Sequence, residues 1–238
     1  MSDVLRIGFA VEGSTDLVML EAAVAAILPE YELETVRLQP EVSDSFTAIA
    51  GTTGFGWPGV YRWCREAVEK GGGSISGGPV LESYDAVVLQ LDADVAGANY
   101  AQGHIDDPAG DLPCEKKCPP PEATTDALRL VLLRWLGEAA EPKKLAICMP
   151  SKSLEAWILA GLYPTDAVVK SGAVECRLKP ERLLSGKPLK GRLVSSNHKD
   201  FDMYRNRASE FAQKWASVEK KCSHAKRFAV ELRTAVTP

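Results

Sequence analysis

The sequence predicts an α/β fold with a mainly parallel central sheet of about four strands, flanked by helices. Short apolar runs alternate along the chain with segments in which apolar residues recur at helical spacing. The runs are nearly continuous, which is typical of strands buried on both faces of a parallel sheet. The hydrophobic content of 45% is ordinary for a globular protein and allows such a core.

The first βαβ unit occupies the N-terminal part of the chain. Residues 4–11 form the first apolar run, and Ser14 or Thr15 is the expected N-cap of the following helix. The helical stripe ends at Pro29, and the alternating segment 33–38 predicts the second strand. Because such crossovers are right-handed and join parallel strands, the sheet is expected to begin with a parallel pair.

Glycine-rich connections lead to the third strand. Residues 51–59 are irregular, residues 60–70 have a helical pattern, and residues 71–78 are mostly glycine and serine. These glycines lack the Gly-Lys-Ser/Thr ending of a phosphate-binding loop, so we interpret them as connections. Residues 84–91 then form the most hydrophobic predicted strand.

A long polar insertion follows at residues 95–122. A segment of this kind beside a site is usually functional or disordered. Thr124 or Thr125 is the expected N-cap of the next helix, and residues 144–149 form the fourth apolar run. Further helical patterns lie at residues 151–159, 203–219 and 222–235.

The charge of the chain divides it into an acidic and a basic part. Residues 1–176 carry 13 Lys/Arg against 26 Asp/Glu, and residues 177–238 carry 15 against 6, so the balances are −13 and +9. This layout suits a polyanionic substrate, although lysine-rich solvated helix faces explain the basic tail equally well. We expect residues 1–161 to form the core, with the insertion, and residues 162–238 to form a basic, mainly helical extension packed on it.

No apolar stretch approaches the roughly 20 residues that a membrane-spanning helix needs. The N-terminus passes directly into the first strand without the regions of a signal peptide, which predicts a cytoplasmic protein. The six cysteines are too sparse for a disulfide scaffold. Cys114 and Cys118 are the one close pair, and we expect an exposed loop with two thiols; half of a zinc site is the alternative.

Acidic residues follow the first and third predicted strands at the point where each strand ends. Glu12 and Gly13 come directly after the first run, and Asp92 and Asp94 directly after the third. Ligands of open parallel sheets bind outside the carboxyl ends of the strands, and Mg²⁺ prefers carboxylate oxygens. Asp16, one helical turn after Glu12, is either a further ligand or only a favourable first-turn charge. The sequence therefore predicts a divalent-metal site.

Ser153 and Glu155 follow the fourth predicted strand by a few residues. Glu155 is a candidate metal ligand, and Ser153 is a candidate for a supporting or phosphate-contacting hydroxyl. A helix cap is the alternative, with Ser151 as the N-cap and Glu155 beyond the first turn. These residues alone leave both interpretations open.

The order of these motifs resembles the Toprim family, the catalytic fold of topoisomerases, primases and OLD-type nucleases. The resemblance rests on a strand followed by Glu12-Gly13 and a helix, and on a later strand followed by Asp92-Ala93-Asp94. It covers roughly residues 4–161. It implies a Toprim/Rossmann-like sandwich, with Glu12 as the acid/base group or a metal ligand and the two aspartates binding Mg²⁺.

The closer likeness is to the OLD-type branch, which is associated with phage-defence nucleases. There, a second acidic residue one turn after the glutamate matches Asp16, and a Ser-x-Glu after the next strand matches Ser153 and Glu155. The resemblance implies two Mg²⁺ or Mn²⁺ ions that clamp an in-line attack on a phosphodiester. It also implies a lysine further along the chain, for which Lys187 and Lys190 are candidates.

OLD-type enzymes usually carry an ATPase domain, and this sequence contains no Walker A motif. The expected partner is therefore a separate ATPase or another subunit of a defence system, unless the chain is a small single-domain relative. The insertion also lies outside the minimal Toprim pattern.

The predicted function is Mg²⁺-dependent hydrolysis of DNA or RNA, with the basic tail contacting phosphates. Trp57 and Tyr204 are candidates for stacking on bases, although packing is their more ordinary role. One alternative is a nucleotide-sugar transferase, because Leu-Asp-Ala-Asp after a strand also occurs in such enzymes; that alternative gives Glu12 no role. A second alternative is a non-catalytic Toprim-fold subunit of a defence complex. The tail residues expected to contact phosphates are Arg177, Lys179, Arg182, Lys187, Lys190, Arg192 and Lys199.

Overall fold

The computed structural model describes residues 4–40, 54–195 and 198–237. A four-stranded parallel sheet forms its centre, with the strand order β2-β1-β3-β4. This confirms the predicted α/β class and the predicted parallel pairing. The strands are β1 (Val4–Ala10), β2 (Glu32–Gln39), β3 (Ala86–Gln90) and β4 (Leu145–Cys148).

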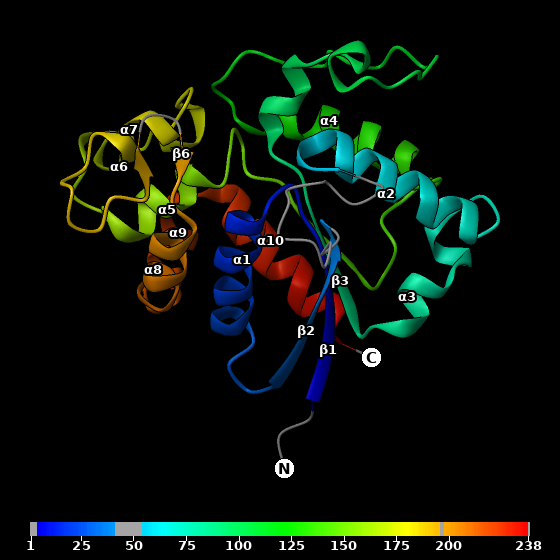
Figure 1. Ribbon diagram of the computed structural model, residues 1–238, viewed down its shortest axis with the longest axis horizontal. Helices are drawn as coiled ribbons and strands as arrows, with labels where there is room; N and C mark the ends of the chain where they lie inside the picture. The colour runs from blue at the N-terminus through cyan, green and yellow to red at the C-terminus, as the bar shows by residue number, and fades with distance from the viewer. Residues whose placement is uncertain (1–3, 41–53, 196–197, 238) are drawn as a thin grey trace.

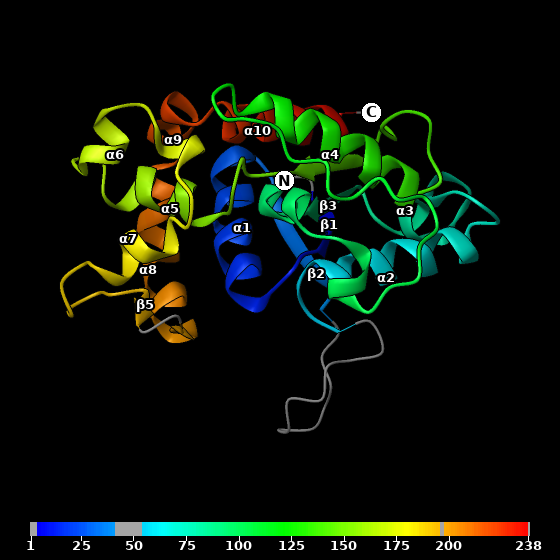
Figure 2. The ribbon, with the colours of Figure 1, turned by 90° about the horizontal axis from the view of Figure 1, so that it is seen from above.

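Helices cover both faces of the sheet, which is why its strands are so apolar. Phe9 and Val88 point into one hydrophobic cluster with α1 (Ser14–Ile27) and α10 (Ser223–Ala235). Val87 and Leu89, whose side chains point to the other face of the sheet, lie in a second hydrophobic cluster. That cluster contains residues of α2 (Gly56–Lys70), α3 (Pro79–Ser83) and α4 (Glu122–Trp135). Figures 1 and 2 show α1 on one side of the strands and α2 and α3 on the other.

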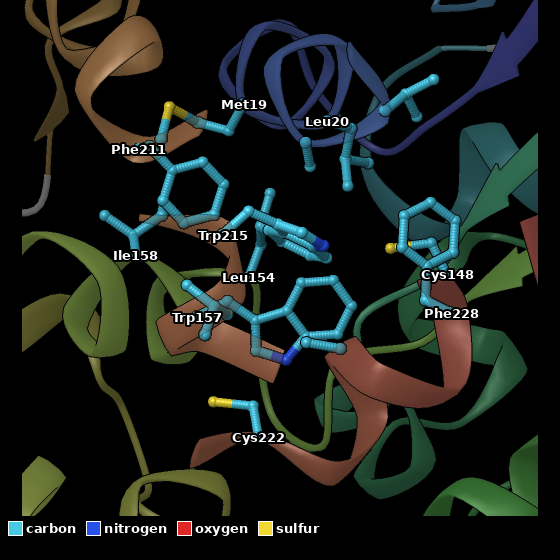
Figure 3. Packing of buried hydrophobic residues seen from close by; sticks show 14 of the residues in the cluster. Met19, Leu20, Cys148, Leu154, Trp157, Ile158, Phe211, Trp215, Cys222 and Phe228 are labelled. Atoms are coloured by element: carbon cyan, nitrogen blue, oxygen red, sulfur yellow. The ribbon is translucent and has the colours of Figure 1, made fainter. Parts of the chain in front are cut away.

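The C-terminal part builds a helical lobe beside α1 (Figure 1). Its core is aromatic: Trp157 stacks with Phe228 and meets Trp215 edge-on, and Trp215 also contacts Phe211 (Figure 3). One continuous cluster thus joins residues from both sides of position 161, and the division into two domains stays a prediction. The lobe consists of α5 (Glu155–Leu162), α6 (Ala167–Lys170), α7 (Glu181–Ser185), α8 (Phe201–Gln213), α9 (Trp215–Lys221) and a short antiparallel pair, β5 (Val194–Ser195) and β6 (His198–Lys199).

The insertion is held against α2 and α4 by aromatic and charged contacts. Tyr100 packs against Trp57 and Trp135, and its hydroxyl accepts a hydrogen bond from Trp135 Nε1 at 2.9 Å. Arg134 forms ion pairs with Asp107 and Asp111 at 3.0 and 2.6 Å. These contacts hold in place a segment with little regular structure. Short 3₁₀ turns are η1 (Ile75–Gly77), η2 (Ala93–Gly97), η3 (Tyr100–Gly103) and η4 (Val174–Cys176).

The expected helix caps were wrong at two places, and the alternative of a Ser151 cap was wrong as well. Helix α1 is capped by Gly13 rather than by Ser14 or Thr15, and α5 begins at Glu155 without Ser151 as its cap. Helix α4 begins at Glu122, before the two threonines that were expected to cap it. Those threonines are buried because tertiary contacts use their hydroxyl groups: Thr124 bonds the backbone of Lys116, and Thr125 bonds His224.

The expectation of two free thiols in the insertion was also wrong. Cys118 forms a disulfide with Cys176 across 58 residues of sequence. Sequence spacing offers no sign of this pairing because the two residues meet only when the insertion folds over the C-terminal lobe. Cys114 is free and partly buried. Across the described ranges, no helix combines the length and apolar character needed to cross a membrane.

Candidate functional site

The predicted acidic residues gather at the carboxyl edge of the sheet, around the point where the strand order reverses. The chain leaves β1 toward β2 on one side, and β3 lies on the other side of β1. Ligands of doubly wound sheets bind at such a switch point. Glu12 follows β1 directly, and Asp92 follows β3, so the topology places these two carboxylates on adjacent strand ends.

Gln90 joins the two strand ends. Its side-chain oxygen accepts a hydrogen bond from the Glu12 backbone N–H at 2.9 Å, and its Nε2 donates to Asp92 Oδ1 at 2.8 Å. The Asp92 backbone N–H donates to Glu12 Oε1 at 2.7 Å. The Leu154 backbone N–H, which follows β4, adds a bond of 3.2 Å to Asp92 Oδ1. Three strand ends are therefore connected through Asp92.

A second pair of carboxylates shares one ammonium group. Lys199 Nζ lies 2.7 Å from Glu155 Oε1 and 3.4 Å from Asp16 Oδ1. The Tyr204 hydroxyl donates to Glu155 Oε1 at 3.1 Å. Both carboxylates are almost fully buried, and the lysine comes from β6 in the C-terminal lobe. The lobe thus supplies the positive charge that balances two acids of the core.

A cavity of about 370 Å³ opens onto this cluster. Asp92, Glu155 and Lys199 line it, and so does Asp94, which is exposed. The nearly buried Lys152, another lining residue, pairs with Glu115 of the insertion at 2.7 Å. The remaining lining residues are Ser153 and the segment 178–181 of the C-terminal lobe.

Burial raises the pKa values of most of these carboxyl groups. Loss of hydration, together with the charges of Asp16 and Asp94, raises the pKa of Glu12 to about 8, although the Asp92 backbone N–H opposes that rise. Loss of hydration also raises the pKa of Asp16 to about 6, against the effect of Lys199, and that of Asp94 to about 6. The pKa of Asp92 lies well above its ordinary value for the same reason and because Glu12 is close.

Glu155 differs from the other acids. Burial alone would raise the pKa of its carboxyl group, but the positive charge of Lys199 and the hydrogen bond from it hold that pKa below its ordinary value. Glu155 is therefore ionised at neutral pH. The close ammonium group, together with hydrogen bonds from Ser153 and the backbone, distinguishes this carboxylate from its neighbours.

The chemistry of the donors fits a hard divalent cation, although the side chains do not converge on a single point. Carboxylates are the ligands that Mg²⁺ and Mn²⁺ prefer, and crowded carboxylates gain from a cation. In the part of the chain that the structure describes, no three Asp, Glu, His or Cys side chains are close enough to hold a metal as they stand. Lys199 lies between two of the candidate ligands. The buried hydroxyl of Ser151 lacks a well-formed hydrogen bond to any described residue, whereas the Ser153 hydroxyl lies close enough to Glu155 to help lower the pKa of that carboxyl group.

Sequence reasoning found the acids and missed the groups that connect them. Glu12, Asp16, Asp92, Asp94, Ser153 and Glu155 all lie at this edge of the sheet. The structure places neither candidate lysine in the cavity: Lys187 pairs with Asp166, and Lys190 is exposed. Lys199, which was expected only among the tail residues that contact phosphates, lies in the site instead. Its position in a two-residue strand gives no periodic signal, and Gln90 reads in the sequence as an ordinary strand residue.

The two aromatic residues considered for base stacking have other contacts. Tyr204 is fully buried and bonds Glu155, and Trp57 packs against Tyr100 and Trp135. Comparison of the chain with protein-family models, with curated proteins and with solved structures found no match.

Proposed function

We propose that this chain hydrolyses phosphodiester bonds of DNA or RNA in a reaction that depends on Mg²⁺ or Mn²⁺. The observation that carries the proposal is the gathering of five carboxylates from three strand ends and one helix at one edge of the sheet, beside a cavity and a partly buried lysine. The Toprim resemblance of the same residues supports it. A role in phage defence, alone or with an ATPase subunit, extends the proposal through that resemblance.

The electrostatics of the cluster favour a bound cation. The carboxyl groups of Glu12, Asp16 and Asp94 have pKa values raised to about 8, about 6 and about 6, first because burial removes their hydration and then because neighbouring carboxylates repel their negative charge. A divalent cation held by such carboxylates polarises a phosphoryl oxygen and lowers the pKa of a water molecule. Asp16, Asp92, Asp94 and Glu155 are the proposed ligands, and Glu12 is a further one.

Glu12 and Lys199 are suited to different parts of the reaction. Glu12 is the candidate general base when it is not a metal ligand, because its carboxyl group stands at the end of β1 next to Asp92. The Asp92 backbone N–H fixes its carboxylate. The Lys199 ammonium stays protonated between Asp16 and Glu155, because their negative charges raise its pKa. It is suited to stabilise negative charge that develops on a phosphoryl group, with the Ser153 hydroxyl beside it.

The transferase alternative fits the contacts less well. It gives Glu12 no role, whereas Glu12 Oε1 accepts a 2.7 Å hydrogen bond from the backbone of Asp92. A non-catalytic subunit could keep the same carboxylate cluster, so only an activity assay distinguishes that alternative from a nuclease.

The test is cleavage by the purified chain of plasmid, linear duplex and single-stranded DNA and of RNA, in Mg²⁺, Mn²⁺ or EDTA. We expect cleavage that requires the cation and disappears in Asp92→Asn. Asp202→Asn is the matched control, because that aspartate is exposed on α8 and pairs with Arg205, away from the cavity. Cleavage that persists in EDTA or in Asp92→Asn contradicts the proposal. So does the absence of cleavage of all four polymers, both alone and with a candidate ATPase partner.

A further inference from the structure

A second hollow adjoins the cavity of the carboxylate cluster. It measures about 440 Å³. Both hollows are lined by Glu115, Lys152 and Leu178, so they meet along the Lys152–Glu115 ion pair. We call the second one the outer hollow. Its other lining residues are Lys116, Lys117 and the disulfide of Cys118 and Cys176.

The outer hollow carries positive charge that the protein leaves unbalanced. Lys116 and Lys117 are exposed, and their ammonium groups make no ion pair or hydrogen bond with the residues that the structure describes. Among the described residues that line the hollow, Glu115 is the only acid, and Lys152 already neutralises it. This basic patch lies in the half of the sequence whose balance is −13, so it is not part of the general charge of the basic tail.

The backbone beneath these two lysines is held firmly. The Thr124 hydroxyl accepts a hydrogen bond from the Lys116 N–H and donates one to the Lys116 carbonyl, both at 3.0 Å. The N–H groups of Cys114 and Glu115 both donate to the Ala96 carbonyl, at 2.8 and 3.0 Å. The disulfide at Cys118 ties the same segment to the C-terminal lobe. Residues 114–118, which we call the lysine ledge, are thus a fixed support for two free charges.

An apolar side chain stands on the border between the hollows. Leu178 is 65% exposed although it lines both of them. An exposed leucine between the acidic cavity and the basic outer hollow offers a surface for the face of a nucleobase, whereas a bare phosphate or an acidic peptide has less use for it. Proteins that bind single strands combine a positively charged groove with side chains, usually aromatic, that contact the faces of the bases; the ledge supplies the charge, and Leu178 supplies an aliphatic contact.

We propose that the lysine ledge binds a backbone phosphate of a single-stranded nucleic acid whose neighbouring phosphodiester enters the carboxylate cavity. This inference rests on the proposed function and adds the form of the substrate. The acids at the cavity floor are deeply buried, with Asp92 and Glu155 exposed by 9% and 2%. A duplex, which stays stiff over about 150 base pairs, does not bend into a cavity of this size, whereas a single strand does.

The test measures binding separately from cleavage. A fluorescein-labelled single-stranded oligonucleotide is titrated with the protein, in EDTA and again in Ca²⁺, and anisotropy is followed at several salt concentrations. We expect Lys117→Glu to weaken binding several-fold and to reduce the magnitude of the salt slope by about 0.7, the value for one lost phosphate contact on a single strand. Lys143→Glu is the matched control, because Lys143 is also exposed but precedes β4 at the opposite edge of the sheet.

Two further arms keep the inference separate from the proposed catalysis. The milder Lys116→Ala/Lys117→Ala variant must show the same loss of binding, which excludes misfolding caused by the reversed charge. Hydrolysis of bis(4-nitrophenyl) phosphate, a diester without further backbone phosphates, reports separately on the carboxylate cavity and should be unchanged in Lys143→Glu. Loss of oligonucleotide binding in the ledge variants supports the ledge whether or not any polymer is cleaved.

Three results would overturn the inference. The first is equal oligonucleotide affinity for wild type, Lys117→Glu and Lys143→Glu, even if metal-dependent cleavage is established. The second is a wild-type protein that binds no single strand in either EDTA or Ca²⁺. The third is a duplex of the same length that binds as tightly as the single strand and is equally sensitive to Lys117→Glu.

Discussion

The two halves of the carboxylate cluster contain the same kind of residue and behave differently. Glu12 and Asp92 are joined by backbone and amide hydrogen bonds and have raised pKa values. Glu155 is as deeply buried, yet its pKa is lowered. The main difference is Lys199 of the C-terminal lobe, whose ammonium lies 2.7 Å from Glu155; at 3.4 Å from Asp16 it opposes the effect of burial without overcoming it, so the pKa of Asp16 stays raised to about 6. The core therefore positions the acids, and the lobe decides which of them carries its charge.

Removing the ammonium group of Lys199 should change the stability of the protein more than any other substitution considered below. Lys199→Met leaves Glu155 buried and unbalanced, and we expect the free energy of unfolding to fall by about 3 kcal/mol, as when one partner of a buried pair is lost. Urea unfolding measures this. The double variant Lys199→Met/Glu155→Gln removes the stranded charge and should recover most of the loss. If the free energy of unfolding of Lys199→Met lies within about 0.5 kcal/mol of the wild-type value, the Lys199–Glu155 ion pair contributes no more than an exposed pair does.

The raised pKa values predict an unusual dependence of stability on pH. Unfolded carboxyl groups lose their protons near pH 4, whereas Asp16 and Glu12 in the folded protein lose theirs at about 6 and about 8. Since the folded state binds more protons in this interval, its stability should fall as the pH rises through it, by up to about 5 kcal/mol between pH 5 and pH 8 for the two groups together. Urea unfolding in EDTA measures the trend.

A saturating divalent cation should reduce or reverse that trend, because it replaces the protons. Repeating the pH series in Mg²⁺ or Mn²⁺ provides this comparison. Stability in EDTA that rises steadily from pH 5 to pH 8 would show that these carboxyl groups are already balanced in the folded protein.

Gln90 tests the other half of the cluster with a smaller effect. Gln90→Leu removes the donor to Asp92 and the acceptor of the Glu12 N–H, and we expect a loss of about 1–2 kcal/mol. Cleavage should fall as well, since the two carboxylates lose their common support. The control is Gln213→Leu on the exposed end of α8. Unchanged stability and activity in Gln90→Leu would remove this residue from the account.

Tyr204 should give the smallest effect. Tyr204→Phe deletes one hydrogen bond to Glu155 and leaves Lys199 in place, so a loss of about 1 kcal/mol is expected in urea unfolding. A loss as large as that of Lys199→Met would mean that the hydroxyl, rather than the ammonium, holds the charge of Glu155.

The periodicity of apolar residues in the sequence was enough to predict the acids that follow the strands, which are about half of the site. Apolar runs locate the buried strands, and parallel strands bring Glu12, Asp92 and the residues after β4 to one edge. No sequence pattern predicts the positions of Lys199, Tyr204 and the Cys118–Cys176 disulfide, because these positions depend on how the C-terminal lobe folds back on the core. The threonines of α4 show the same limit: both are caps by local preference, and tertiary hydrogen bonds use their hydroxyls instead.

The central claim is that the carboxylates at the switch point bind a divalent cation. Calorimetric titration of Mn²⁺ into the metal-free protein at pH 7.5 tests it most directly. We predict saturable binding with release of protons, since Glu12 is partly protonated there, and loss of that binding in Asp92→Asn but not in Asp202→Asn. Absence of binding to the wild-type protein, or equal binding to Asp92→Asn, would contradict the claim.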